Sequence, residues 1–212
     1  MKVRWHGHSC FEVDGKVKIV MDPHDGKSIG LKVPKASPDI ALLSHDHFDH
    51  NAVGVLGGKP VVVRGAGERV EKEVALKGVE TFHDDVGGQK RGRNVAFSFE
   101  MDGVRFAHLG DLGHVLTDEQ TSMLGKVDVL FVPVGGVFTV DSMKALAVVN
   151  KVQPKVIVPM HFRFGGLTLG ISPVSDFTKL LPKAVKVREV GSEVEFAAED
   201  LPEKQECWLF SL

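Results

Sequence analysis

The stretch that decides the fold is IALLSHDHFDH, residues 40–50. Its apolar beginning predicts a buried strand that ends at Ser44. Residues two apart on an extended segment project to the same side, so His45 and His47 are placed to bind one metal ion. Asp49 and His50 are adjacent and would point apart in a strand, so we expect the chain to turn there into a helix, with both side chains facing a second ion. The pattern predicts a strand, a metal-binding loop and a helix; the alternative is a polar surface turn that happens to carry histidines.

The composition predicts a single domain over residues 1–212. With 43% hydrophobic residues the chain can bury a substantial core. Its 26 basic and 28 acidic residues leave a formal charge of -2, which is unlike the basic surface of a nucleic-acid-binding protein, so we expect no nucleic-acid partner. Two cysteines, Cys10 and Cys207, are too few for a disulfide framework or a cysteine-rich zinc module.

The chain shows no signal of export or membrane insertion. Polar residues interrupt its beginning, MKVRWHGHSCFEVDG, where a signal peptide would need an unbroken apolar stretch. No apolar run approaches the roughly 20 residues that span a bilayer. We therefore expect a cytoplasmic protein with no membrane partner.

Short strands dominate the beginning of each half of the chain and helices follow, which predicts two β-layers covered outside by helices. Besides the strand at 40–44, strands are predicted at Val3–Trp5, Cys10–Val13, Val17–Met21, Glu80–His83, Val95–Met101, Val104–Leu109, Val127–Val134, Val156–Met160, Val185–Val190, Val194–Ala197 and Trp208–Phe210. Asp102-Gly103 predicts a hairpin turn. Helices are predicted at Gly67–Lys77, after a capping box at Thr117–Gln120, at Asp141–Val152, and from Ser172-Pro173 to Pro182.

The segment Gly87–Arg93 (GGQKRGR) is basic and rich in glycine. This composition predicts a mobile loop. Contact with a substrate and a merely solvated connection are equal alternatives for it.

The HxHxDH pattern after a buried strand resembles the signature of the metallo-β-lactamase superfamily. The resemblance extends from Trp5 to His161 and implies an α/β fold, a four-layer αββα sandwich. The segment WHGHSCF, residues 5–11, resembles the start of a branch that includes L-ascorbate-6-phosphate lactonase-like proteins and uncharacterised small metal-dependent hydrolases. The chain lacks the additional domains and long arms of tRNA-processing, mRNA-cleaving or flavin-bearing relatives. It also lacks the metal-binding cysteine of some β-lactamases.

The resemblance implies a site for two metal ions. One ion would be held by His45, His47 and His83, the other by Asp49, His50 and His161, and both by a bridging Asp111. His108 and His114 are the alternatives to His83. By the same resemblance Asp22 orients the metal-binding loop, with a simple turn residue as the alternative, and His8 either supports the site or is a structural histidine. Arg163 either attracts an anionic substrate at the mouth of the site or forms a surface ion pair.

The implied function is hydrolysis of a small ester, lactone or phosphoester by hydroxide bound between two divalent ions. Zn²⁺ is the default ion, and Mn²⁺, Fe²⁺ and Ni²⁺ also suit imidazole and carboxylate ligands. Asp111 would compensate charge, and Asp49 would pass a proton to the leaving group. A metal-dependent nuclease and a metal-binding protein without turnover are the alternatives. We expect a small-molecule substrate and leave open whether the chain forms a homo-oligomer.

Overall fold

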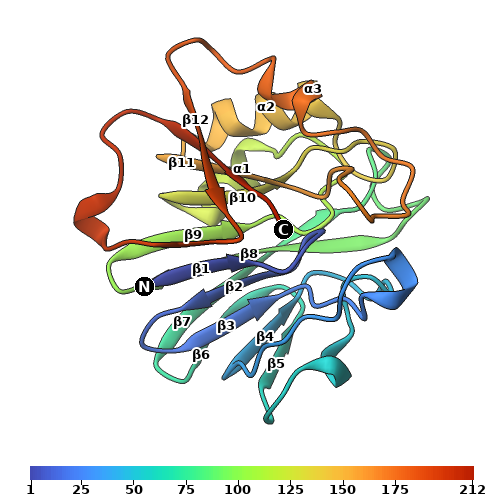
Figure 1. Ribbon diagram of the computed structural model, residues 1–212, viewed down its shortest axis with the longest axis vertical. Helices are drawn as coiled ribbons and strands as arrows, with labels where there is room; N and C mark the ends of the chain where they lie inside the picture. The colour runs from blue at the N-terminus through green and yellow to red at the C-terminus, as the bar shows by residue number, and fades with distance from the viewer.

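The computed structural model describes all 212 residues and contains two mixed β-sheets packed face to face (Figure 1). The first sheet has six strands, in the order β13 (Glu193–Glu195), β1 (Lys2–Trp5), β2 (Phe11–Asp14), β3 (Lys18–Met21), β4 (Ile40–Leu43) and β5 (Val61–Arg64). The second has eight strands, in the order β12 (Lys186–Gly191), β14 (Glu206–Phe210), β11 (Val156–Met160), β10 (Val129–Pro133), β9 (Val104–His108), β8 (Arg93–Met101), β7 (Val74–Phe82) and β6 (Gly67–Glu71).

A core of 45 buried residues extends from the space between the sheets to the helices outside the eight-stranded sheet. In strands that have one face on this core, buried and half-buried residues alternate. In β1, Val3 and Trp5 are buried while Lys2 and Arg4 are half-buried. The central strands β10 and β11 are buried along their whole length, as parallel strands covered on both faces are. β9, β10 and β11 are parallel, so the segments after them meet at one edge of the sheet.

The α-helices lie against the eight-stranded sheet. α1 (Asp118–Leu124) packs on β7 and β8, α2 (Ser142–Val152) packs on β10, and α3 (Ser175–Thr178) packs on α2. The outer face of the six-stranded sheet is covered instead by the loop around Ala36 and by the 3₁₀ turn η2 (Val53–Val55). They enclose a small second cluster formed by Cys10, Val20, Ala36, Ala41 and Leu56. The expected α/β fold with two face-to-face sheets is confirmed. Of the two outer helical layers of the predicted four-layer αββα sandwich, α-helices form one, and loops with 3₁₀ turns form the other.

The helix predicted at Gly67–Lys77 is wrong, because this segment forms β6, a turn and the beginning of β7. The turn residues Lys72 and Glu73 have φ angles of 50° and 66°, a left-handed pair that turns a two-residue hairpin. Neither is a glycine, asparagine or aspartate, so no turn signal marks the position. Val74 and Leu76 of β7 are buried in the hydrophobic core, and this burial outweighs the helical spacing of the sequence.

Three further elements differ from prediction. The chain turns at Asp49–His50 as expected, but the next element is the 3₁₀ turn η2 and not a helix. The helix predicted from Ser172 is shorter and consists of α3 alone. The residue at its N-cap is Val174, which provides no side-chain hydrogen bond. Ser172 lies outside the helix, and its amide bonds to the Gly135 carbonyl of a neighbouring loop. The edge strand β5 was not predicted. The other strands, α1 with its capping box, α2 and the hairpin at Asp102-Gly103 are confirmed within a few residues at each end.

Candidate metal centre

The predicted ligand residues come after strands of both sheets. His45 follows β4 of the first sheet, while His83, Asp111 and His161 follow β7, β9 and β11 of the second. β7 is antiparallel to β8, and β8 is antiparallel to β9, so β7, β9 and β11 run in the same direction and end at the same edge. The fold therefore gathers residues that are up to 116 positions apart, from 45 to 161, at one edge of the sandwich.

The first ligand group consists of His45, His47 and His83. One ligand atom of each lies within 4.8 Å of the others. The ring centroids are 4.6 Å apart for His45 and His47, 4.8 Å for His45 and His83, and 4.9 Å for His47 and His83. Three imidazoles at this spacing can all reach one transition-metal ion.

The two alternatives to His83 have other partners. His108 donates from Nε2 to the Ser9 carbonyl at 2.9 Å and accepts at Nδ1 from the Gly110 amide at 3.2 Å. His114 donates from Nδ1 to the Val115 carbonyl at 2.9 Å and accepts at Nε2 from the Phe82 amide at 3.2 Å. Both ring nitrogens of each histidine are occupied by backbone groups, so neither is free to bind a metal ion. Of the three candidates, only His83 belongs to a ligand group.

The second ligand group consists of Asp49, His50, His161 and, in addition to the predicted ligands, His8. Their ligand atoms also lie within 4.8 Å of one another. Asp49 Oδ2 is 3.2 Å from His8 Nε2 and 3.6 Å from His50 Nε2. The resemblance placed His8 near the site only as a supporting residue, whereas the structure places it among the ligand atoms.

Asp111 lies between the two groups. Its Oδ2 atom is 3.2 Å from Nε2 of His161, 3.3 Å from those of His50 and His83, and 3.9 Å from that of His45. Two ligands that each lie about 2.1 Å from one ion are separated by about 3.0 to 3.4 Å at octahedral or tetrahedral angles. The distances from Asp111 Oδ2 to His161, His50 and His83, which belong to both groups, lie in this range, whereas the distance to His45 is longer.

Asn94 holds the Asp111 segment in place and was not predicted as a site residue. Its Oδ1 accepts from the Asp111 amide at 2.9 Å, and its Nδ2 donates to the Leu109 carbonyl at 2.9 Å and to Thr81 Oγ1 at 2.7 Å. Gly110 between them has a φ of 54°, and a Cβ atom there would clash with the side chains of Asn94 and Ser44. The positive φ favours glycine at position 110 for a local reason, whereas the approach of Ser44 and Asn94 depends on the tertiary fold, including the pairing of β8 and β9.

Asp22 contacts His50 directly and His45 through Ser44, and the orienting role predicted for it stays a prediction. Its Oδ2 accepts from His50 Nδ1 at 3.0 Å. Its two oxygens also accept from the Ser44 amide at 2.8 Å and the Ser44 hydroxyl at 2.6 Å, and that hydroxyl lies 2.8 Å from His45 Nδ1. Carboxylates that bind the second nitrogen of a metal-binding histidine fix its orientation and tautomer.

The protonation states and unpaired atoms of the site fit divalent cations. Burial, reinforced by His50, lowers the pKa of the His45 imidazole to about 3. Burial raises the pKa of the Asp111 carboxyl, but His161 and His50 bring it well below its ordinary value. Burial lowers the pKa of His50, but Asp111 and Asp22 raise it well above its ordinary value, so a bound cation would displace a proton there. His45 Nε2, His50 Nε2 and Asp111 Oδ1 are buried without a hydrogen-bond partner, which leaves them available as ligands.

The basic loop at 87–93 is held by the residue after His83. Asp84 accepts from the amides of Val86 at 3.0 Å and of Gly88, Lys90 and Arg91 at 2.8 Å each. Burial raises the pKa of the Asp84 carboxyl, but these four donors lower it to about 2. The loop that we predicted to be mobile is thus hydrogen-bonded to the residue next to His83. The guanidinium of Arg91 in this loop lies 4.7 Å above the Phe138 ring.

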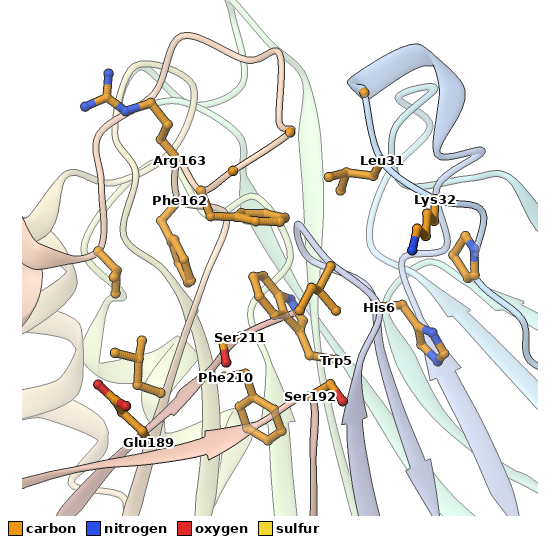
Figure 2. Close-up of a pocket in the computed structure, with 18 of the residues that line it drawn as sticks. Trp5, His6, Leu31, Lys32, Phe162, Arg163, Glu189, Ser192, Phe210 and Ser211 are labelled. Carbon is orange, nitrogen blue, oxygen red and sulfur yellow. The ribbon is translucent and has the colours of Figure 1, made fainter.

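Arg163 belongs to neither ligand group. It is exposed and lines a cavity of about 930 Å³ with Trp5, Phe162 and Lys32, and Figure 2 shows its guanidinium extending away from Trp5. None of the predicted metal ligands lines this cavity. The structure therefore does not bring Arg163 together with the other predicted site residues.

Comparison with known proteins shows the family of this chain. Residues 2–161 match the family model described as the beta-lactamase superfamily domain. The chain belongs to the metallo-β-lactamase superfamily. One relative is a UPF0173 metal-dependent hydrolase of Archaeoglobus fulgidus. It is 27% identical to this chain, and the alignment covers 92% of this chain and 94% of the relative. A UPF0173 protein of Pyrococcus furiosus is 31% identical, over 76% of this chain and 83% of that one.

A solved structure agrees with this placement in the superfamily. A Thermotoga maritima protein, assigned as a Zn-dependent hydrolase of the metallo-β-lactamase superfamily, matches with a TM-score of 0.83 at 36% identity, covering 99% of this chain and 97% of that one. The superfamily, its fold and membership among small metal-dependent hydrolases are confirmed. The longest α-helix, α2, has 11 residues, so no helix has the length and apolar character of a membrane span.

Proposed function

We propose that this chain hydrolyses a small ester, lactone or phosphoester with the help of two divalent metal ions. The observation that carries the proposal is the position of Asp111 Oδ2, between 3.2 and 3.9 Å from four imidazole nitrogens that belong to two ligand groups. One carboxylate oxygen shared by two such groups is the arrangement that a bridging ligand requires. All of these residues come from one chain, so the centre needs no second subunit.

Each residue of the centre has a role in the proposal. His45, His47 and His83 hold one ion, and Asp49, His50 and His161 hold the other. Two bound ions supply Lewis acidity and lower the pKa of a bound water to near neutrality. We propose Zn²⁺, in line with the assignment of the Thermotoga maritima relative, while Mn²⁺, Fe²⁺ and Ni²⁺ suit the same ligands. Burial raises the pKa of the Asp49 carboxyl, but His8 and His50 lower it below its ordinary value, so Asp49 starts ionised. Its Oδ2 accepts the proton that the attacking water loses and passes it to the leaving group.

The loop residue Arg91 favours an anionic substrate. Its guanidinium is exposed, forms no ion pair and is held over Phe138 at 4.7 Å. The amide of Arg91 is fixed by Asp84, directly after the ligand His83. A small molecule with a carboxylate or phosphate on an apolar body would match this pair of side chains. We propose that Arg91 binds the anionic group while the scissile bond lies at the two ions.

The test is hydrolysis of chromogenic esters, lactones and phosphoesters by the metal-free and the Zn²⁺-reconstituted protein. We expect turnover of at least one class only after reconstitution, and a loss of at least about 100-fold in kcat for Asp111→Asn. Asp128→Asn is the matched control, because Asp128 is a buried aspartate at the opposite end of the strands. Turnover that survives both metal removal and Asp111→Asn would contradict the proposal, as would no turnover of any class by the fully loaded protein.

A further inference from the structure

His8 lies inside the second ligand group although it comes from the loop between β1 and β2 and not from the HxHxDH segment. Its side chain is fully buried. The His8 ring centroid is 4.2 Å from that of His161 and 5.0 Å from that of His50. The 3.2 Å between His8 Nε2 and Asp49 Oδ2 equals the separation between Asp111 Oδ2 and His161 Nε2, and it is the spacing of neighbouring ligands on one ion.

The backbone around His8 fixes this position. His8 has a φ of 54°, a left-handed conformation that costs a non-glycine residue about 1 kcal/mol or more. Its carbonyl accepts from Trp5 Nε1 at 3.0 Å and from the His161 amide at 3.3 Å. The first bond holds the His8 loop to the Trp5 side chain, and the second ties it to the backbone of His161, a predicted ligand, so the His8 ring and the His161 ring are placed together.

The hydrogen bonds of His8 differ from those of the structural histidines. His108 and His114 have backbone partners at both ring nitrogens. The His8 ring has no backbone partner: its Nε2 faces Asp49, and its Nδ1 is buried without any partner. A fully buried imidazole whose only hydrogen-bond partner is a carboxylate predicted to bind metal is placed as a ligand would be.

We propose that His8 is a ligand of the second metal ion. This inference rests on the two-metal centre proposed above. The first ion then has four protein ligands: His45, His47, His83 and Asp111. The second has five: His8, Asp49, His50, His161 and Asp111. Four protein ligands suit tetrahedral Zn²⁺. Five protein ligands leave one further ligand position on an ion that accepts six-fold coordination, such as Mn²⁺, Fe²⁺ or Ni²⁺. The two positions therefore differ in the metal they prefer.

The test compares His8→Gln and His8→Ala by calorimetric titration of the metal-free protein with Zn²⁺ and with Mn²⁺. Glutamine keeps a donor for the hydrogen bond to Asp49 but is a poor ligand for these ions. We expect both variants to bind the first ion as the unchanged protein does and the second at least about 10-fold more weakly. His24→Gln is the control, because His24 is buried but belongs to neither group, and it should bind both ions normally.

Other results would overturn the assignment. If His8→Gln binds the second ion normally while His8→Ala does not, His8 only positions Asp49; if both bind it normally, His8 is structural. Binding of the first ion shows that a variant is folded, and should His8→Ala fail to fold, His8→Gln alone decides. No binding of either ion by the unchanged protein would refute the metal centre itself, a result distinct from the selective loss of the second ion.

Discussion

His50 shows how single residues build this centre, because both of its ring nitrogens face carboxylates. Nδ1 bonds to Asp22 at 3.0 Å, while Nε2 lies 3.3 Å from Asp111. Asp22 also holds Ser44, which contacts His45. One carboxylate behind the ligands thus sets the direction of a histidine in each ligand group.

Replacing Asp22 should weaken metal binding although Asp22 is not itself predicted to bind metal. We expect Asp22→Ala to lower metal affinity about 10-fold to 100-fold, because the His50 and His45 rings lose their orienting partners. Competition with a chromogenic chelator measures this. Asp25→Ala, at an aspartate that bonds only to Ser28 in its own turn, is the control and should bind normally. Equal affinities for both variants would refute the orienting role.

The residues of the candidate centre can be predicted from the sequence to different degrees. His45, His47, Asp49 and His50 form one contiguous pattern, and the resemblance implies the remaining predicted ligands. The role of Asn94 was not predictable, because its contact with the Asp111 amide arises only when β8 pairs with β9. The position of His8 among the ligands likewise depends on contacts with residues that lie more than 40 positions away.

Among the secondary-structure elements, prediction succeeded where the signal was local. The capping box predicts α1 because Thr117 and Gln120 bond to each other's backbone, and Asp102-Gly103 predicts its hairpin because both residues tolerate positive φ. The Lys72-Glu73 turn has the same left-handed backbone without such residues. The helical spacing of its apolar residues therefore predicts a helix, since only pairing with β8 reveals the strand.

The β6–β7 turn offers a test that separates a hairpin from a helix. We expect the double substitution Lys72→Asn with Glu73→Gly to raise the free energy of unfolding by about 1 kcal/mol, because both residues then suit positive φ. Urea denaturation measures the change. Gly within a helix lowers stability by about 1 kcal/mol, so a decrease would contradict the hairpin. Glu71→Gly, within β6, serves as the control and should destabilise.

The contact between β9 and the beginning of β10 predicts a pH dependence of stability. Asp128 accepts from Arg105 at Nε (2.7 Å), Nη2 (2.8 Å) and the amide (3.0 Å). Burial raises the pKa of the Asp128 carboxyl, but Arg105 lowers it below its ordinary value. The stability that this pair contributes is therefore present above the unfolded-state pKa and is lost as the pH falls from about 5 through the lower folded-state pKa.

Substitution of either partner should reduce that dependence. We expect Asp128→Asn to lower the free energy of unfolding at pH 7 by about 1 to 3 kcal/mol and to flatten its decline toward acid pH. Arg105→Gln, the matched change on the partner, should flatten the same decline. Urea titrations at a series of pH values provide the measurement, and an acid slope unchanged in both variants would contradict this assignment.

At the scale of the whole molecule, the residues of the candidate centre come from both sheets. His45, His47, Asp49 and His50 follow β4 of the six-stranded sheet, whereas His83, Asp111 and His161 follow strands of the other sheet. An ion held by both sets binds only the folded arrangement, so its binding free energy adds to the stability of the whole sandwich.

Metal removal should therefore destabilise the entire fold. An ion present at 100 times its dissociation constant contributes about 2.7 kcal/mol, which corresponds to a decrease of about 5 to 10 °C in Tm after chelation. Differential scanning calorimetry with and without chelator measures it. Asp111→Ala, which lacks the shared carboxylate, should show a much smaller chelator effect. An unchanged Tm of the unaltered protein would contradict a centre that links the sheets.

The most direct test of the central claim is the metal content per chain, measured by inductively coupled plasma mass spectrometry on protein purified without chelator and after reconstitution. The two ligand groups predict about two equivalents of divalent transition metal per chain. They also predict a loss of metal in Asp111→Ala. Metal content that remains near zero after reconstitution, or that is unchanged in Asp111→Ala, would contradict the two-metal centre.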